Sequence, residues 1–289
     1  MRGVFLSIFS VMCMLVFSTV MFSGGNLLMF WLFLELSTLS LIPSFFLYLD
    51  SGVLPSLFSY IMVSGVSSSL IVSGVLFENF LILSVMGLLL KFGLFPLLGW
   101  VYVVTVYSNW LVVWGLSTVL KSAFLFFGFF LSGGFGLWLV GCCCFFTFIF
   151  VGVFLWLYTY GWVYFWTHVM VCSSAALIVM SVEVSSDLLL YVYLIYVVWS
   201  TLVILFLSRL DGMVVSGGGY YFLVVFLLVS FPGSLVVFYK VFIGLCVYSC
   251  GLVAFSGWVF YNVSEQFFLV KCLIGCGLPR SEWGGCISI

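Results

Sequence analysis

The stretch LLLKFGLFPLLGW, residues 88–100, places a lysine, a glycine and a proline inside a long apolar run. Lys91 has no charged residue within a dozen positions on either side. Pro96 lacks a backbone N–H and its ring clashes with the carbonyl four residues earlier, so a helix must kink or break there. Gly93 loosens the same turn. The stretch therefore predicts a broken helix in apolar surroundings, with an ammonium group beside the break.

The rest of the chain has the same apolar character. Of its 289 residues, 66% are hydrophobic and 5% are charged. Stretches of about 20 apolar residues recur, and each is long enough to cross a hydrocarbon core of roughly 30 Å. We therefore predict an all-α polytopic membrane protein in contact with membrane lipids.

Hydropathy, with Gly, Asn, Asp and Ser taken as loop positions, predicts about ten membrane-spanning helices. No linker is long enough to separate domains, so residues 1–289 are expected to form a single transmembrane domain. The expected spans are 4–22, 27–48, 54–76, 79–101, 108–131, 135–157, 160–182, 187–208, 218–249 and 251–270.

Charges outside these spans indicate the orientation. If successive spans alternate in direction, every basic residue outside them falls on the side of the N-terminus. The positive-inside rule then places both termini on the inner side. The residues concerned are Arg2, Arg209, Lys271 and Arg280.

Several classes of function are disfavoured. The net charge is −1 and there is no basic run, so nucleic acid is not an expected partner. The opening MRGVFLSIFSVMCMLVF has no small-residue cleavage site, and it is expected to be a retained first span. Cys142, Cys143 and Cys144 lie inside an apolar segment, and Cys272 and Cys276 lack the CxxC spacing. No disulfide, metal site or cofactor-binding site is therefore expected in this chain.

Four charged residues remain deep within the expected spans. At about 1.5 Å per residue they lie roughly 12–18 Å from the outer boundary, near the midplane. Together they cost about 10–14 kcal/mol on the insertion scale. A lysine can be neutral in apolar surroundings and charged beside a carboxylate, so a row of such groups suits lateral proton relay, although a purely structural ion pair is the simpler alternative. The four are Glu35, Lys91, Lys121 and Lys240.

A second broken helix is predicted in SFPGSLVVFYK, residues 230–240. Pro232 and Gly233 break it, and Lys240 follows two turns later. At membrane depth the carbonyls freed by such a break must face protein or a water-filled cavity, so water is expected beside Lys91. Paired broken helices are typical of transporters built from inverted repeats, but proline and lysine come in opposite order here, which supports repeat symmetry only weakly.

Other candidates are weaker. The segment SGVSSSLIVSG, residues 64–74, favours close helix packing, with hydroxyl groups along a wet path as the alternative. His168 lies near a span end and is expected to be interfacial or packed rather than part of a relay. Glu265 and Lys271 lie near the end of the last span, where both can extend toward water.

Several of these motifs resemble the family of subunit 2 of the respiratory NADH:ubiquinone oxidoreductase, in its mitochondrially encoded form. In KFGLFPLLGW, Lys91, Gly93, Pro96 and Trp100 match the family signature, with Leu98 at its histidine position. The segments FLELSTLSLIP, GLSTVLKSAF and FPGSLVVFYKVF match in the same order along the chain, as does CSSAALIVM, which has Leu177 where the family usually has a histidine.

The resemblance implies an antiporter-type bundle with two broken helices, in the mitochondrial inner membrane with both termini in the matrix. It makes Glu35 and Lys91 an ion pair that opens and closes, Lys121 an intermediate relay group and Lys240 the terminal one. The partners would be the other subunits of respiratory complex I. Those subunits would handle NADH, flavin, iron–sulfur clusters and ubiquinone in electron transport, and this chain would contribute proton translocation.

Two further readings remain open. A stand-alone cation/proton antiporter would use the same lysine–carboxylate chemistry beside broken helices. A purely structural scaffold would tolerate neutral replacement of all four deep charges.

Overall fold

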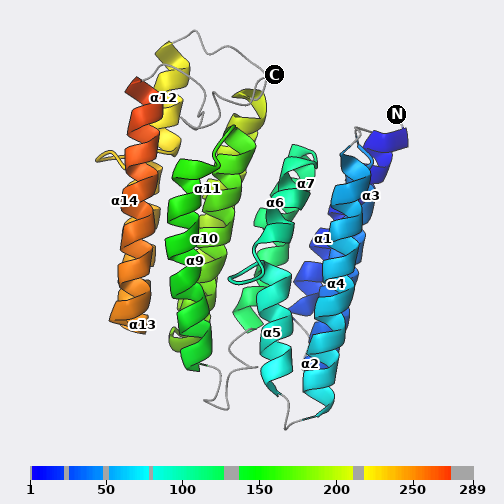
Figure 1. Cartoon of the computed structure of the whole chain (residues 1–289). Helices are drawn as coiled ribbons and strands as arrows, with labels where there is room; N and C mark the ends of the chain where they lie inside the picture. The colour runs from blue at the N-terminus through cyan, green and yellow to red at the C-terminus, as the bar shows by residue number, and fades with distance from the viewer. Residues whose placement is uncertain are drawn as a thin grey trace. The chain divides into compact units, whose positions relative to one another are not determined.

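The computed structural model describes residues 2–22, 26–47, 52–77, 81–126, 137–210 and 218–274. Across these ranges all regular secondary structure is helical (Figure 1). The chain divides into two compact units, Met1–Trp138 (unit 1) and Leu139–Ile289 (unit 2). Asp50, Glu78, Asp211, Arg280 and Glu282 lie outside the described residues, and the predicted orientation stays a prediction.

Unit 1 is built from short and long helices, of which α4 packs along α5 and α1 along α2. Its core gathers apolar side chains that include Met14, Phe45, Tyr60 and Val104. The helices are α1 (Arg2–Met21), α2 (Leu27–Ser40), α3 (Ile42–Phe45), α4 (Val53–Leu76), α5 (Leu81–Phe92), α6 (Gly99–Val106), α7 (Trp110–Ser117) and the 3₁₀ helix η2 (Val119–Phe126).

The contact of α4 with α5 depends on small residues, as the sequence predicted. A Cβ atom at Gly74 would lie 2.2 Å from the Ser84 Oγ, and one at Gly87 would lie 2.8 Å from the Ser67 carbonyl oxygen. The two backbones can therefore approach only because neither position carries a side chain.

Unit 2 is organised around α10, whose side chains are buried along most of its length. It packs against α11, α13 and α14. Its helices are α9 (Leu137–Leu157), α10 (Trp162–Glu183), α11 (Ser186–Leu210), α12 (Gly218–Leu227), α13 (Leu235–Cys250) and α14 (Leu252–Ile274).

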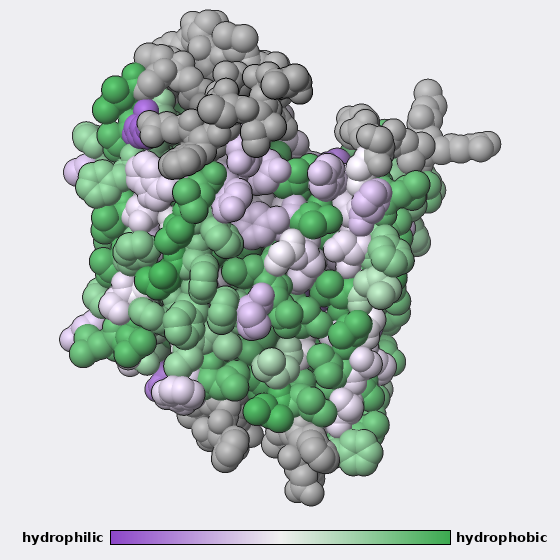
Figure 2. All heavy atoms as spheres, viewed as in Figure 1, coloured by the Kyte–Doolittle hydropathy of each residue, from purple (hydrophilic) through white to green (hydrophobic). Residues whose placement is uncertain are grey.

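Among the described residues, six helices are long and apolar enough to cross a membrane, and several shorter apolar helices accompany them. Large apolar side chains such as Phe5, Phe58 and Leu245 are exposed, and the surface viewed in Figure 2 is mostly hydrophobic. Such a surface is suited to lipid, which confirms the all-helical membrane class. The count of ten spans stays a prediction.

The two predicted helix breaks are both present. The expected span 79–101 is interrupted between α5 and α6, and the span 218–249 is interrupted between α12 and α13. Gly93 and Gly233 adopt positive φ angles of 65° and 90° at these interruptions.

The expectation of an unbroken helix over 108–131 is wrong, because α7 ends at Ser117 and η2 follows. The Ser117 and Thr118 hydroxyls both donate to the Trp114 carbonyl oxygen, at 3.2 and 2.6 Å. The same kind of bond occurs inside helices that continue, for example from Thr147 to the Cys143 carbonyl oxygen in α9, so these bonds accompany the end of α7 and do not by themselves explain it. Lys121 therefore lies on a 3₁₀ turn rather than on a continuous α-helix. The span 27–48 is likewise divided, into α2 and α3 at Leu41.

Candidate functional site

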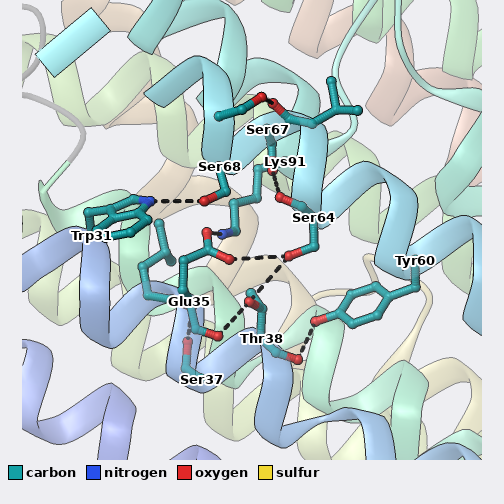
Figure 3. Close-up of polar contacts among 12 residues, drawn as sticks. Trp31, Glu35, Ser37, Thr38, Tyr60, Ser64, Ser67, Ser68 and Lys91 are labelled. Carbon is teal, nitrogen blue, oxygen red and sulfur yellow. Dashed lines mark hydrogen bonds and ion pairs between the residues drawn. The ribbon is translucent and has the colours of Figure 1, made fainter. Parts of the chain in front are cut away.

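The first buried ion pair, in unit 1, joins Glu35 on α2 to Lys91 in the last turn of α5 (Figure 3). The Lys91 ammonium donates to Glu35 Oε1. The Lys91 side chain is only 7% exposed and the Glu35 side chain 17%. Water therefore solvates neither charge well, and each charge depends on the other for stabilisation. The sequence predicted both residues, and the structure brings them together.

One hydroxyl group contacts the other oxygen of this carboxylate, and further hydroxyl groups lie beside it (Figure 3). Ser64 of α4 donates to Glu35 Oε2 at 3.4 Å. The Ser64 Oγ also lies 3.4 Å from the Thr38 Oγ1, and the Tyr60 hydroxyl donates to the Thr38 carbonyl oxygen at 2.8 Å. The Glu35 carboxylate is thus shared between the Lys91 ammonium and one neutral donor, Ser64, so it keeps a partner if Lys91 moves away. The segment SGVSSSLIVSG, residues 64–74, therefore contributes a polar contact through Ser64 as well as close helix packing.

The end of α5 fixes the position of Lys91. Gly93 N–H donates to the Leu90 carbonyl and Leu94 N–H to the Leu89 carbonyl, both at 3.1 Å, which is a Schellman motif. The indole of Trp100 reaches back from α6 and donates to the same Leu90 carbonyl at 3.0 Å. The carbonyls of Leu89 and Leu90 at this helix end are therefore satisfied by protein groups. A cation in the last turn also interacts favourably with the negative end of the helix dipole.

The second buried ion pair, in unit 2, joins Lys240 on α13 to Glu265 on α14, with 2.8 Å between Nζ and Oε2. The side chains are 13% and 4% exposed. The expectation that Glu265 extends toward water is therefore wrong. That expectation placed the helix end near residue 270, whereas α14 continues to Ile274 and Glu265 lies well inside it. The polar segment NVSEQ, residues 262–266, was the sequence signal for a buried polar face on this helix.

Side chains also bind backbone groups at the helix break beside the second pair. The indole of Trp199 on α11 donates to the carbonyl of Leu227, the last residue of α12, at 3.0 Å. The side-chain oxygen of Gln266 accepts from the Ser230 N–H at 2.7 Å. The Pro232–Gly233 break is thus held by side chains from α11 and α14, and the second of these comes directly after Glu265.

Two other sequence candidates are fully enclosed. Lys121 is 2% exposed on η2 in unit 1. His168 is 0% exposed on α10 in unit 2, so it is packed rather than interfacial. The predicted row of four charges joins residues from both units, so their common depth stays a prediction.

The arrangement is suited to moving protons. Each unit holds a lysine and a carboxylate in direct contact, each lysine lies near a helix break, and neutral hydroxyl groups stand beside the first pair. Within the described ranges no group of three or more His, Cys, Asp or Glu side chains could hold a metal ion. The sequence matches no protein-family model, and it has no significant match among curated proteins.

Proposed function

We propose that this chain is a proton-translocating membrane subunit of a respiratory NADH:ubiquinone oxidoreductase. The observation that carries the proposal is the buried Glu35–Lys91 pair at the end of a helix that breaks within an apolar run. The motif resemblance described above supplies the name of the complex, and the pair supplies the chemistry.

In the proposed cycle the pair alternates between a closed and an open state. In the closed state the carboxylate stabilises the ammonium form of Lys91. In the open state Glu35 keeps its bond with Ser64, and Lys91, without a counter-ion in apolar surroundings, releases its proton. Lys121 receives the proton next, and Lys240 is the terminal lysine.

The proposal extends to the setting of the protein. The chain crosses the mitochondrial inner membrane about ten times, with both termini in the matrix. Other subunits of the complex bind NADH, flavin, iron–sulfur clusters and ubiquinone, and the energy for opening the pair comes from them.

The first test is purification of the native membrane assembly. Co-migration of this chain with NADH-oxidising subunits supports the proposal. Isolation of the chain alone, with cation/proton exchange activity in liposomes, would support the stand-alone antiporter instead.

The second test measures NADH-driven proton pumping and quinone reduction for Lys91→Met and Glu35→Gln in the assembled complex. Because a positioned proton-transfer group contributes about a hundredfold or more, both variants should lose most pumping while still assembling. Lys271→Met is the matched control, since Lys271 is exposed near the end of α14. Normal coupled turnover in an assembled Lys91→Met complex would overturn the relay.

A further inference from the structure

A small cavity lies beside the second ion pair, entirely within unit 2. Its volume is about 30 Å³, and Lys240 and Glu265 form part of its wall together with residues of α10, α11, α13 and α14. A site needs roughly 10–15 Å³ to hold a water molecule, provided that it also offers polar partners. The cavity is therefore large enough for water.

Polar groups line this cavity. Ser173 Oγ donates to the Met170 carbonyl at 2.9 Å and lies 3.3 Å from the Tyr196 hydroxyl, and a hydroxyl oxygen with two lone pairs can also accept from water. Asn262 donates from Nδ2 to the Trp258 carbonyl at 2.8 Å, so its own amide oxygen remains an acceptor. Glu265 binds Lys240 through Oε2, and its other oxygen is a further acceptor. The three oxygens match in number the two to four polar partners that a buried water molecule needs.

We propose that the cavity holds water and that Glu265 transfers protons between this water and Lys240, so that the second pair is a proton-transfer site rather than a fixed ion pair. The inference rests on the proposed function and adds a residue to its relay. The ligand class is water or hydronium, and the added proton carrier is a carboxylate.

The transfer balances without any further reactant. An N–H bond of the Lys240 ammonium breaks and an O–H bond forms on Glu265, which leaves a neutral amine beside a neutral carboxylic acid. The acid then releases its proton to the cavity water, and the amine binds a new proton. One proton enters and one leaves, and the ion pair is restored.

The structure also links this site to the nearby helix break. Gln266 follows Glu265 on α14 and holds the Ser230 N–H of the break. Lys240 lies on α13, the helix that begins after the break. A change in the backbone of the break would therefore act on both partners of the pair. It would act on Lys240 through α13 and on Glu265 through its neighbour Gln266 on α14.

Two variants together test whether Glu265 carries protons and whether the fold requires the ion pair. Glu265→Gln leaves the Lys240 ammonium buried without its partner, so its effect alone is ambiguous. The double variant Lys240→Met with Glu265→Gln removes both charges, and a purely structural pair can usually be replaced in this way. We expect the double variant to assemble normally, which would show that the fold does not require the pair, whereas its loss of pumping would follow from the loss of Lys240 alone. Glu265 itself is tested by Glu265→Gln in the assembled complex, where Lys240 is intact: pumping should fall to about one tenth of the normal rate or less, and normal pumping would overturn the inference.

Two further measurements address the carboxylate and the water. Glu265→Asp keeps an acid at this position and should recover part of the pumping, whereas Glu183→Gln, at an exposed position of the same unit, should have no effect. Ala176→Val narrows the cavity without changing either charge, and it should lower pumping severalfold while the complex stays assembled. Full activity with the valine would show that water in the cavity is not required.

An infrared difference spectrum gives a readout apart from turnover. The wild-type complex should show a protonated carboxyl band during turnover that is absent in Glu265→Gln and shifts in heavy water. If this band is unchanged in Glu265→Gln, the inference fails. The proposed function is judged separately by Lys91→Met, because normal pumping in the Glu265 variants with loss of pumping in Lys91→Met would reject only the inference.

Discussion

The ion pair between Glu35 and Lys91 allows a quantitative test by a double-mutant cycle. Glu35→Gln leaves the Lys91 ammonium, only 7% exposed, without its counter-charge, and Lys91→Met leaves a carboxylate that is 17% exposed. Breaking a buried pair from one side costs about 3–5 kcal/mol, and we expect Lys91→Met at the lower end because Glu35 is more accessible and keeps Ser64. The double variant should return to within about 2 kcal/mol of the parent protein.

Thermal unfolding of the purified protein in lipid nanodiscs measures these differences. A thiol-reactive dye reports unfolding as buried cysteines such as Cys144 and Cys172 become accessible. With about 2–4 °C per kcal/mol for a chain of this size, each single variant should unfold roughly 10 °C below the parent, and the double variant only slightly below it. If the double variant is as unstable as the sum of the two single variants, the side chains are not energetically coupled and the argument from their contact is refuted.

Two further predictions concern the helix breaks. Gly93→Ala places a side chain at a φ of 65° and puts its Cβ 2.1 Å from Val101 Cγ2, so it should destabilise the protein by about 2 kcal/mol or more in the same unfolding assay, whereas Gly99→Ala meets nothing within 4 Å and should be tolerated. A stable Gly93→Ala variant would contradict the close approach of Gly93 to Val101. Trp199→Phe keeps an aromatic side chain but replaces the indole with a smaller phenyl ring and removes the donor to the Leu227 carbonyl, which should cost at least about 1–3 kcal/mol, and equal stability of this variant would show that another group satisfies the carbonyl.

The features that follow from local chemistry were predictable from the sequence. Proline ends a helix through its own missing N–H, so the breaks at Pro96 and Pro232 required no knowledge of the tertiary structure. The depth of Lys91 within an apolar run indicated a buried partner, and Glu35 was the one acidic residue among the four deep charges.

The partner of Lys240 was not predictable in the same way. Glu265 is separated from it by 25 positions, and only the packing of α13 against α14 shows that the two side chains meet. The error began with a helix end placed too early, which put Glu265 near a predicted membrane boundary.

The interruption before Lys121 was missed for a different reason. The residues of α7 and of η2 are similarly apolar, and hydropathy does not distinguish an α-helix from a 3₁₀ helix, so no pattern marked the change at Thr118.

The two tryptophans at the breaks make each break observable by spectroscopy. Trp100 and Trp199 each bind the backbone of a helix end through the indole N–H, so any rearrangement of a break changes the environment of one indole. The chain has 11 tryptophans, so bulk fluorescence would mix their signals, but fluorinated tryptophan gives each ring its own magnetic resonance line. The breaks of the two units could then be followed separately, in a protein whose lysines and carboxylates are all unaltered.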